Sequence, residues 1–503
     1  MPLQQHLFIV KLLLLAALIA CLVLLTASTF LTPVSNDAGA YLTIADGWLI
    51  GKLPYHDLFD HKTPGIYALY ALILAATGRS LTAVQLVQLA GQIACAGLVA
   101  WIAWRRWNWL AGALAGVLML YGSAAFSGPH LTTEAWVAVC IAAALALLLW
   151  RKGVQPAGWQ WFAAGLAVGL AGLFKQTGLA TLLAFGGWAW LQRDGWRGIM
   201  RRWLWLLIGC ALPLAVTAAY FAANGALDDL WRDAIWVNLT NYPRLSPMTL
   251  LRGNLVNLRG FPLLWLGVLL TLIFARPRLR RAFQPDTAAL LWLTLLTGLL
   301  PLLHRSYGHY VLQALPPATI LAGAGLAGGW AWLVGKVTAR DDMDAGLRGH
   351  DANHASSRPR RWTSRVVLAA VIVGVLALAL IDLPRWPRYL AYTGDLVRTQ
   401  DQAATAVERA TQPGEPILVV TDSPQIYFLS NRQPPIRWQY LLPINYTPER
   451  EAELAGMITN HAVRIVVTDS ADQDWHAHLK GAAESSCTLL ETFDDRFSLY
   501  DCS

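Results

Sequence analysis

Long apolar runs separated by short polar segments make up most of the chain. A helix needs about 20 apolar residues to cross the hydrocarbon core of a bilayer, and many of these runs approach that length. The pattern predicts eleven transmembrane helices, which we place at residues 8–31, 82–104, 109–127, 134–150, 158–174, 177–192, 203–223, 260–275, 287–303, 309–334 and 366–383. We therefore expect an α-helical polytopic membrane protein.

The first run decides how the chain enters the membrane. A cleaved signal peptide has an apolar stretch of only about 7–15 residues. Residues 8–31 are almost wholly apolar apart from Lys11. Residues 18–21 resemble a lipoprotein cleavage box, but the apolar run continues beyond them to Leu31. We expect an uncleaved first transmembrane helix.

Composition excludes a soluble multidomain enzyme and explains the positive charge. Hydrophobic residues make up 56% of the chain and charged residues 14%, whereas soluble domains carry about 25% charged residues. The net charge of +8 could indicate nucleic-acid binding. Most loop cations, however, lie in every second loop, from Arg105 and Arg106 to the stretch 336–365. This bias sets orientation in a membrane, so we expect a cytoplasmic N-terminus, an extracytoplasmic C-terminal segment and no nucleic-acid partner.

The long polar segments divide the chain into two parts. Residues 1–383 form the transmembrane module, which contains two long outer loops at 32–81 and 224–259. Residues 384–503 form a separate outer domain. The stretch 336–365 is rich in Asp, His, Ser and Arg, a composition that predicts a flexible cytoplasmic linker.

The outer domain has the pattern of a small α/β fold. Residues 416–420 and 464–468 are short apolar runs typical of buried strands. Between them, Thr447 followed by Pro448 is a helix-start signal for residues 448–460. A strand–helix–strand order predicts a parallel strand pair.

A hairpin is predicted at the end of the chain. Residues 487–502 have a strand pattern on both sides of Asp494 and Asp495, which we expect at the turn. A turn centred between these two residues places Cys487 opposite Cys502. Outside the cytoplasm such a pair can form a disulfide, and two free thiols are the alternative.

The first outer loop holds the best candidates for chemistry. Residues 38–50 and 64–78 have the pattern of helices lying on the membrane surface. Asp37 directly precedes the first of them, and Lys62 precedes the second. A carboxylate beside an apolar wall can act as a general base, and a lysine can bind a phosphate as a point charge. Solvated loop charges are the alternative interpretation.

Three groups of residues resemble the motifs of a known family. Asp37 follows the first helix, Tyr41 comes four residues later, and Lys62-Thr63-Pro64 opens an apolar stretch. The stretch 304–317, His-Arg-Ser-Tyr-Gly-His-Tyr-Val-Leu-Gln-Ala-Leu-Pro-Pro, and the stretch 423–432 add to the pattern. Together they resemble the C superfamily of membrane glycosyltransferases (GT-C). More narrowly, they resemble its glycosyltransferase family 39-like branch, which contains protein O-mannosyltransferases and lipid A aminoarabinose transferases.

The resemblance implies a fold and a mechanism. The fold would be a GT-C-like bundle of about eleven transmembrane helices, with juxtamembrane helices and a small C-terminal extracytoplasmic α/β domain. The activity would be an inverting hexosyl or pentosyl transfer from a polyprenyl-phosphate sugar to an envelope lipid, glycan or protein. Asp37 would be the general base, and Lys62 would neutralise the departing phosphate. No cofactor is required, and the protein would lie among the lipids of the bacterial inner (plasma) membrane.

Further site residues follow from the same resemblance. The aminoarabinose branch has an arginine three residues after the acidic residue, where this chain has Ala40. Another cation must then assist, and Arg305 and Lys175 are the candidates. A substrate cavity is expected to include Tyr41, Asp60, His61, Glu134, His309, Tyr310 and Gln313.

Two alternatives stay open at this stage. Glu134 begins a predicted helix, so its carboxylate has the alternative role of a favourable charge at the helix N-terminus. His61, His130, His304 and His309 would have to converge to bind a divalent metal, which is a weaker hypothesis than no metal.

The alternative function is a non-catalytic lipid or polysaccharide transporter. Transporters often contain internal repeats and polar groups at the membrane midplane. The chain shows no internal repeat, and its polar groups cluster at the outer ends of the predicted helices. This distribution favours the enzyme.

Overall fold

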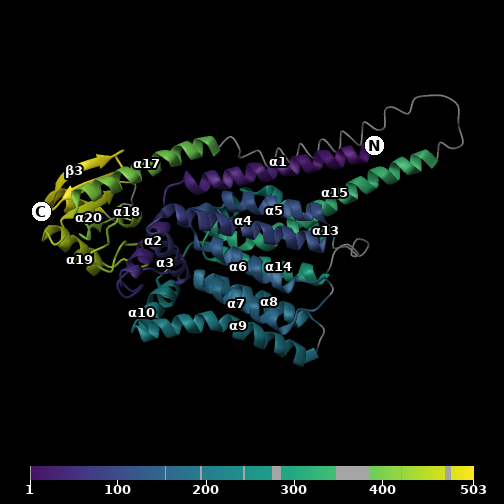
Figure 1. Cartoon of the computed structure of the whole chain (residues 1–503), viewed down its shortest axis with the longest axis horizontal. Helices are drawn as coiled ribbons and strands as arrows, with labels where there is room; N and C mark the ends of the chain where they lie inside the picture. The colour runs from purple at the N-terminus through teal and green to yellow at the C-terminus, as the bar shows by residue number, and fades with distance from the viewer. Residues whose placement is uncertain are drawn as a thin grey trace.

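A computed structural model describes the chain over residues 2–152, 154–192, 195–241, 244–274, 285–346, 386–420, 422–470 and 477–503. The molecule has a long helical bundle and a smaller domain of helices and strands at one end of it (Figure 1). Helices α2, α3 and α10 lie at that same end, whereas the N-terminus lies toward the other.

The bundle is formed by helices that run roughly side by side. They are α1 (Pro2–Phe30), α4 (Leu81–Arg106), α5 (Trp109–Ala125), α6 (Thr133–Leu148), α7 (Gly158–Phe174), α8 (Thr181–Leu191), α9 (Gly195–Ala223), α13 (Pro262–Phe274), α14 (Pro285–Leu299) and α15 (Leu315–Gly346). Each overlaps one of the predicted transmembrane ranges, and α1, α9 and α15 extend beyond theirs. The last predicted range, 366–383, lies outside the described residues.

Within the residues that the structure describes, fewer helices than the predicted eleven qualify as membrane spans when each must be both long enough and apolar enough. Four helical stretches of the described chain meet both conditions, or up to five if the bent pair α12–α13 counts as one span. They are Phe8–Phe30, Leu81–Arg106, Gly195–Ala223 and Gly308–Trp332. Several others, such as α6 and α8, are apolar but short. The polytopic helical class is confirmed, and the count of eleven stays a prediction.

Small residues allow close helix packing inside the bundle. A Cβ atom on Gly165 of α7 would meet the carbonyl oxygen of Leu206 on α9. A Cβ atom on Gly209 of α9 would meet the carbonyl oxygen of Phe162 on α7. Membrane helices associate through such small residues because lipid supplies no hydrophobic force between them.

The two outer loops of the bundle are largely helical. The first contains α2 (Asn36–Leu49) and α3 (Gly65–Thr77), where the surface helices are predicted. The Ser35 side chain caps α2 by accepting a hydrogen bond from the Ala38 backbone at 3.2 Å. The second loop contains α10 (Leu227–Leu230), the π-helical turn η3 (Trp231–Trp236), α11 (Val237–Thr240) and α12 (Pro247–Arg259). Helix α12 meets α13 at 91°.

Short 3₁₀ turns mark the outer ends of several bundle helices. They are η1 (Gly128–His130), η2 (Gln176–Ala180), η4 (Leu300–Leu303) and η5 (Gly308–Ala314). All four hold candidate residues or lie close to them. His130 lies in η1, Lys175 precedes η2, Arg305 lies two residues after η4, and His309 lies in η5.

The predicted cytoplasmic linker is partly helical, which corrects the sequence interpretation. Helix α15 continues to Gly346, so residues 336–346 extend a bundle helix. The polar composition suggested a flexible segment. Lysine, arginine and alanine are nevertheless good helix formers, and residues 336–346 contain all three. The remainder of the linker lies outside the described residues.

The smaller domain has the predicted α/β topology. Its elements are α17 (Trp386–Ala410), β1 (Leu418–Val419), α18 (Gln425–Leu429), α19 (Pro448–Thr459), β2 (Ile465–Asp469), α20 (Ala477–Ser486), β3 (Thr488–Phe493) and β4 (Phe497–Asp501). The sheet order is β1-β2-β4-β3, with β1 parallel to β2. Thr447 caps α19 as predicted.

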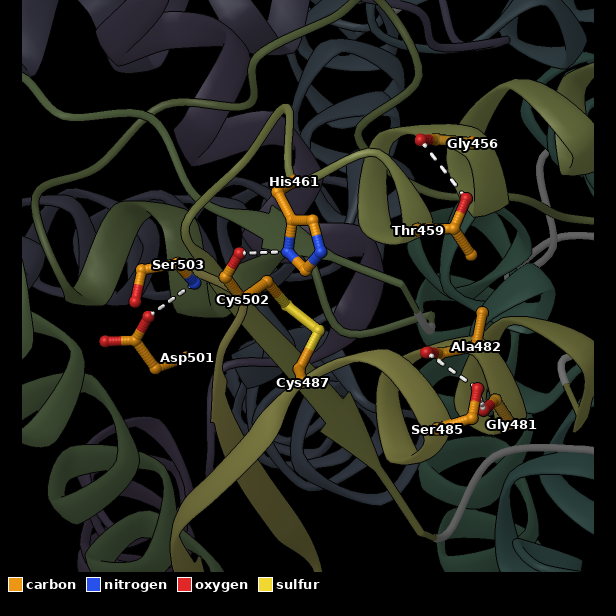
Figure 2. The surroundings of a disulfide bond; sticks show 10 residues. All are labelled: Gly456, Thr459, His461, Gly481, Ala482, Ser485, Cys487, Asp501, Cys502 and Ser503. Carbon is orange, nitrogen blue, oxygen red and sulfur yellow. Dashed lines mark hydrogen bonds between the residues drawn. A yellow bond between two sulfur atoms is a disulfide. The ribbon is translucent and has the colours of Figure 1, made fainter.

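The terminal hairpin has a longer turn than predicted. Near the cysteines the register matches, because Thr488 pairs with Asp501. Near the turn Phe493 pairs with Phe497, and a bulge between Leu489 and Glu491 absorbs the difference. Asp494 and Asp495 lie at the turn as predicted, but the turn also includes Arg496, so its centre is shifted from the point between the two aspartates. The sequence pattern did not reveal the bulge. Cys487 and Cys502 are joined by a disulfide at the open end of the hairpin, where the His461 ring lies 2.5 Å from the Cys502 carbonyl oxygen (Figure 2).

Candidate active site

Asp37 and Lys62 meet at the end of the bundle where α2 and α3 lie. Asp37 lies in the first turn of α2, where the helix dipole favours a negative charge. Its side chain is 47% exposed, and its Oδ2 lies 3.8 Å from the Lys62 Nζ atom, whose side chain is 10% exposed. The structure thus brings together a reachable carboxylate and a largely buried ammonium, which the sequence pattern proposed as a pair.

Asp60 and His61 lie directly behind Lys62. The Lys62 Nζ atom is 2.8 Å from His61 Nε2, and His61 Nδ1 is 3.2 Å from Asp60 Oδ1. Burial would raise the pKa of Asp60, but the close His61 ring and the nearby Lys62 charge outweigh it and lower the pKa to about 2. Burial and the Lys62 charge lower the pKa of His61. The pair is therefore a carboxylate and a neutral imidazole at neutral pH.

A second charged cluster lies across the bundle end. Glu134, near the start of α6, forms an ion pair with Lys175, and Thr133 Oγ1 donates to its other oxygen at 3.0 Å. His309 Nε2 lies 3.6 Å from the Glu134 carboxylate, and the Lys175 ammonium lies 3.6 Å from the centroid of the Tyr310 ring. The charges of Asp37 and Lys62 both act on His309, so the two clusters are electrostatically connected.

The remaining candidate residues have less accessible positions. Tyr41 is buried and packs against Tyr67, with ring centroids 6.0 Å apart. Gln313 is buried and accepts a hydrogen bond from Thr177 at 3.2 Å. Arg305 is also buried, in the segment between η4 and η5. These three side chains are buried, in contrast to the half-exposed Asp37 carboxylate.

The backbone at residues 61–62 is held by side chains that sequence reasoning missed. Gln176 and Asn238 both donate to the His61 carbonyl oxygen, at 3.1 and 2.7 Å. Tyr55 donates its hydroxyl to the Lys62 carbonyl oxygen at 2.7 Å. No local pattern signals the Gln176 and Asn238 contacts, because these residues lie 115 and 177 positions from His61 in the sequence.

The candidate histidines contact other side chains of the described chain. Within the described ranges, no group of three or more His, Cys, Asp or Glu side chains is arranged to hold a metal ion. His130 Nε2 lies 3.2 Å from the Tyr389 hydroxyl, and His309 Nε2 lies near the Glu134 carboxylate. The observed arrangement is instead one of carboxylates with buried cations.

Solved structures of similar shape identify the fold. No protein-family model matches the chain, and no curated protein matches it by sequence. ArnT from Cupriavidus metallidurans bound to undecaprenyl phosphate is 18% identical, with a TM-score of 0.62, and the match covers 98% of each chain. The apo state of the same protein gives 17% identity, 98% coverage of each chain and a TM-score of 0.61.

A more distant structure has the same architecture in a longer chain. The apo oligosaccharyltransferase of Archaeoglobus fulgidus is 14% identical with a TM-score of 0.51, and the match covers 97% of this chain and 74% of that one. The chain therefore has the fold of ArnT, a fold that agrees with the resemblance of its motifs.

Proposed function

We propose that this protein is an inverting glycosyltransferase that uses a polyprenyl-phosphate sugar as donor. The observation that carries the proposal is the half-exposed Asp37 carboxylate beside the buried Lys62 ammonium, at the outer end of a bundle with the fold of ArnT. The ArnT structure contains undecaprenyl phosphate, the lipid that such a donor leaves behind. The acceptor belongs to the envelope lipids, glycans or proteins.

Asp37 acts as the general base in this proposal. An acceptor hydroxyl approaches the exposed side of the carboxylate and loses its proton as the oxygen attacks the anomeric carbon. The bond between that carbon and the phosphate oxygen breaks at the same time. One displacement without a covalent enzyme intermediate inverts the anomeric configuration. Positioned bases of this kind contribute about 10²- to 10⁴-fold to rate.

Lys62 stabilises the charge that develops on the leaving phosphate. Its ammonium lies in a largely buried position, where a fixed charge acts more strongly than in water. Lys175 is already paired with Glu134, so Arg305 is the better candidate for a second phosphate contact. Ala40 supplies no such charge.

The orientation follows from the loop charges. We place the protein in the bacterial plasma membrane with a cytoplasmic N-terminus and the site outside the cytoplasm. Nucleotide sugars are absent there, which accounts for a lipid-linked donor.

The test is sugar transfer by purified protein in lipid, with a panel of polyprenyl-phosphate sugars and envelope acceptors. We expect Asp37→Asn to reduce transfer by roughly 10²- to 10⁴-fold. Asp395→Asn is the matched control, because that carboxylate is 66% exposed on α17 and contacts Arg398. Equal rates for wild type and Asp37→Asn, with the fold intact, would remove Asp37 from the mechanism.

A further inference from the structure

The Lys62 side chain ends a line of three buried polar groups. Lys62, His61 and Asp60 are only 8%, 4% and 1% exposed. The contacts run from the Lys62 ammonium to His61 Nε2 at 2.8 Å, and from His61 Nδ1 to Asp60 Oδ1 at 3.2 Å. Three neighbouring residues in the sequence thus form a chain of contacts, and its last member, Lys62, lies 3.8 Å from Asp37.

We propose that Asp60 and His61 are positioning residues, which hold the Lys62 ammonium between the general base and the donor phosphate. In this relay His61 carries its proton on Nδ1 and donates it to Asp60, while Nε2 accepts a hydrogen bond from Lys62. The role in donor binding rests on the proposed function, whereas the relay itself does not.

The proton positions follow from the chemistry of the three groups. An ammonium has only donors and a carboxylate has only acceptors, while a neutral imidazole has one of each. Lys62 therefore requires an unprotonated Nε2, which leaves the proton on Nδ1, facing Asp60. At many metal and catalytic sites, a carboxylate that accepts a hydrogen bond from one ring nitrogen fixes the tautomer of the histidine in this way.

The relay also keeps the base and the cation apart. A charged hydrogen bond between ammonium and carboxylate is about 2.7–2.9 Å long, but Lys62 Nζ lies 3.8 Å from Asp37 Oδ2. Because His61 accepts one ammonium proton, Lys62 is not fully committed to Asp37. The carboxylate then stays available for an acceptor hydroxyl, and the ammonium for a phosphate.

The backbone supports the same geometry. Asp60 Oδ1 accepts hydrogen bonds from the backbone nitrogens of His61 and Lys62, at 2.5 and 3.3 Å. Gln176 and Asn238 bind the His61 carbonyl from the other side. Little reorganisation of this loop is needed when a phosphate arrives, which is the condition for effective electrostatic stabilisation.

The first test reads the His61 tautomer without any substrate. The full chain, with ¹⁵N-labelled histidine, is studied by solid-state NMR in lipid bilayers at pH 7. The His61 signals are those that disappear in His61→Gln. We expect a protonated Nδ1 and an unprotonated, hydrogen-bonded Nε2, with a changed tautomer ratio in Asp60→Asn. A protonated Nε2, as the other neutral tautomer or as imidazolium, would overturn the relay.

The second test measures binding of undecaprenyl phosphate, with the uncharged undecaprenol for comparison. Gln retains an acceptor near the position of Nε2, so His61→Gln should bind within about threefold of wild type. His61→Leu lacks the acceptor and should bind the phosphate roughly tenfold or more weakly. His478→Leu is the control, because that side chain is 69% exposed. Equal affinities of His61→Gln and His61→Leu would contradict the positioning role.

The two tests separate the relay from the proposed function. If wild type bound the phosphate and the alcohol equally, the proposed donor would be wrong while the NMR result still decided the relay. If the tautomer were wrong while wild type preferred the phosphate, the relay would fail and the donor class would stand.

Discussion

Glu134 and Lys175 show how a candidate catalytic residue can have a structural partner. Their side chains are only 3% and 7% exposed, and each neutralises the other. Removing one member of a buried pair leaves an uncompensated charge in a low-dielectric site. Each charge therefore depends on the other at the junction of α6 and η2, whatever the pair contributes to substrate binding.

We predict that Lys175→Met destabilises the protein by about 3–5 kcal/mol, since it leaves the Glu134 carboxylate buried without its cation. The double variant Glu134→Gln/Lys175→Met should recover most of this loss. Thermal unfolding in detergent measures both. Arg398→Met is the control for an exposed pair and should cost less than about 1 kcal/mol. A single variant as stable as the control would contradict the buried-pair account.

The depressed pKa of Asp60 predicts that the stability of the fold changes with pH. Its pKa is about 2 in the folded chain, against an ordinary value of 3.8. Because the folded-state pKa is depressed, this carboxylate stabilises the fold above pH 3.8, and that contribution disappears as the pH falls toward 2.

The measurement is the unfolding midpoint of wild type and Asp60→Asn between pH 5 and about pH 2. We expect the wild type to lose its advantage as the pH falls through this window, because the variant has no group to protonate at residue 60. Parallel curves for the two proteins would show that Asp60 has no depressed pKa.

Residues close in sequence were the ones that could be predicted. Asp37 and Lys62 lie in one loop and flank two recognisable surface helices, so their pairing was accessible from the pattern. Gln176 and Asn238 reach His61 across sequence separations of 115 and 177 residues. The Glu134–Lys175 pair likewise joins two different helix ends. Such contacts depend on how the bundle packs, which single-sequence patterns do not contain.

At the scale of elements, the contact between α2 and α18 joins the loop that contains Asp37 and Lys62 to the outer domain. A Cβ atom on Gly39 would overlap the backbone of Gln425, at the start of α18. Thr43 Oγ1, one turn further along α2, donates to the Pro424 carbonyl oxygen at 3.2 Å. Gly39 therefore sets the distance between the helix that carries Asp37 and the domain above it.

We predict that Gly39→Ala lowers the unfolding midpoint and also the transfer rate, because α2 must move away from α18. Gly394→Ala is the matched control, since a Cβ atom there meets nothing within 4 Å. Alanine in a helix interior should stabilise that site by roughly 0.5–1 kcal/mol. Equal effects of the two substitutions would show that the close approach is unimportant.

Element boundaries followed local signals well where those signals exist. Thr447 and Pro448 marked the start of α19, and the apolar runs marked β1 and β2. The predictions failed where tertiary structure decides, as in the bulge of the terminal hairpin and the extension of α15 to Gly346. The predictions relied on the spacing of hydrophobic residues along the chain, and neither the bulge nor the helix extension alters that spacing.

At the scale of the whole molecule, the three long outer segments meet at one end of the bundle (Figure 1). Gln439 of the outer domain donates to the Phe59 carbonyl oxygen at 3.1 Å, and Arg437 forms an ion pair with Asp233 of the second loop. The alternating loop charges predict that these three segments lie on the same side of the membrane. Their common location agrees with that prediction.

We predict that this end faces outside the cytoplasm. Ser485→Cys lies on the exposed part of α20 and should react with a membrane-impermeant maleimide in intact spheroplasts. Lys152→Cys lies at the opposite end and should react only after lysis. The four free cysteines are buried, so background labelling should be low. The reverse labelling pattern would invert the orientation and the proposed location of the site.

The most direct test of the central claim is the choice of donor. Purified wild-type protein in lipid receives the same radiolabelled sugar either on polyprenyl phosphate or on a nucleotide, together with envelope acceptors. The account predicts transfer from the lipid-linked sugar alone, with one polyprenyl phosphate released for each sugar transferred and an inverted anomeric centre in the product. Transfer from the nucleotide sugar, or movement of the lipid-linked sugar across the bilayer without transfer, would contradict it.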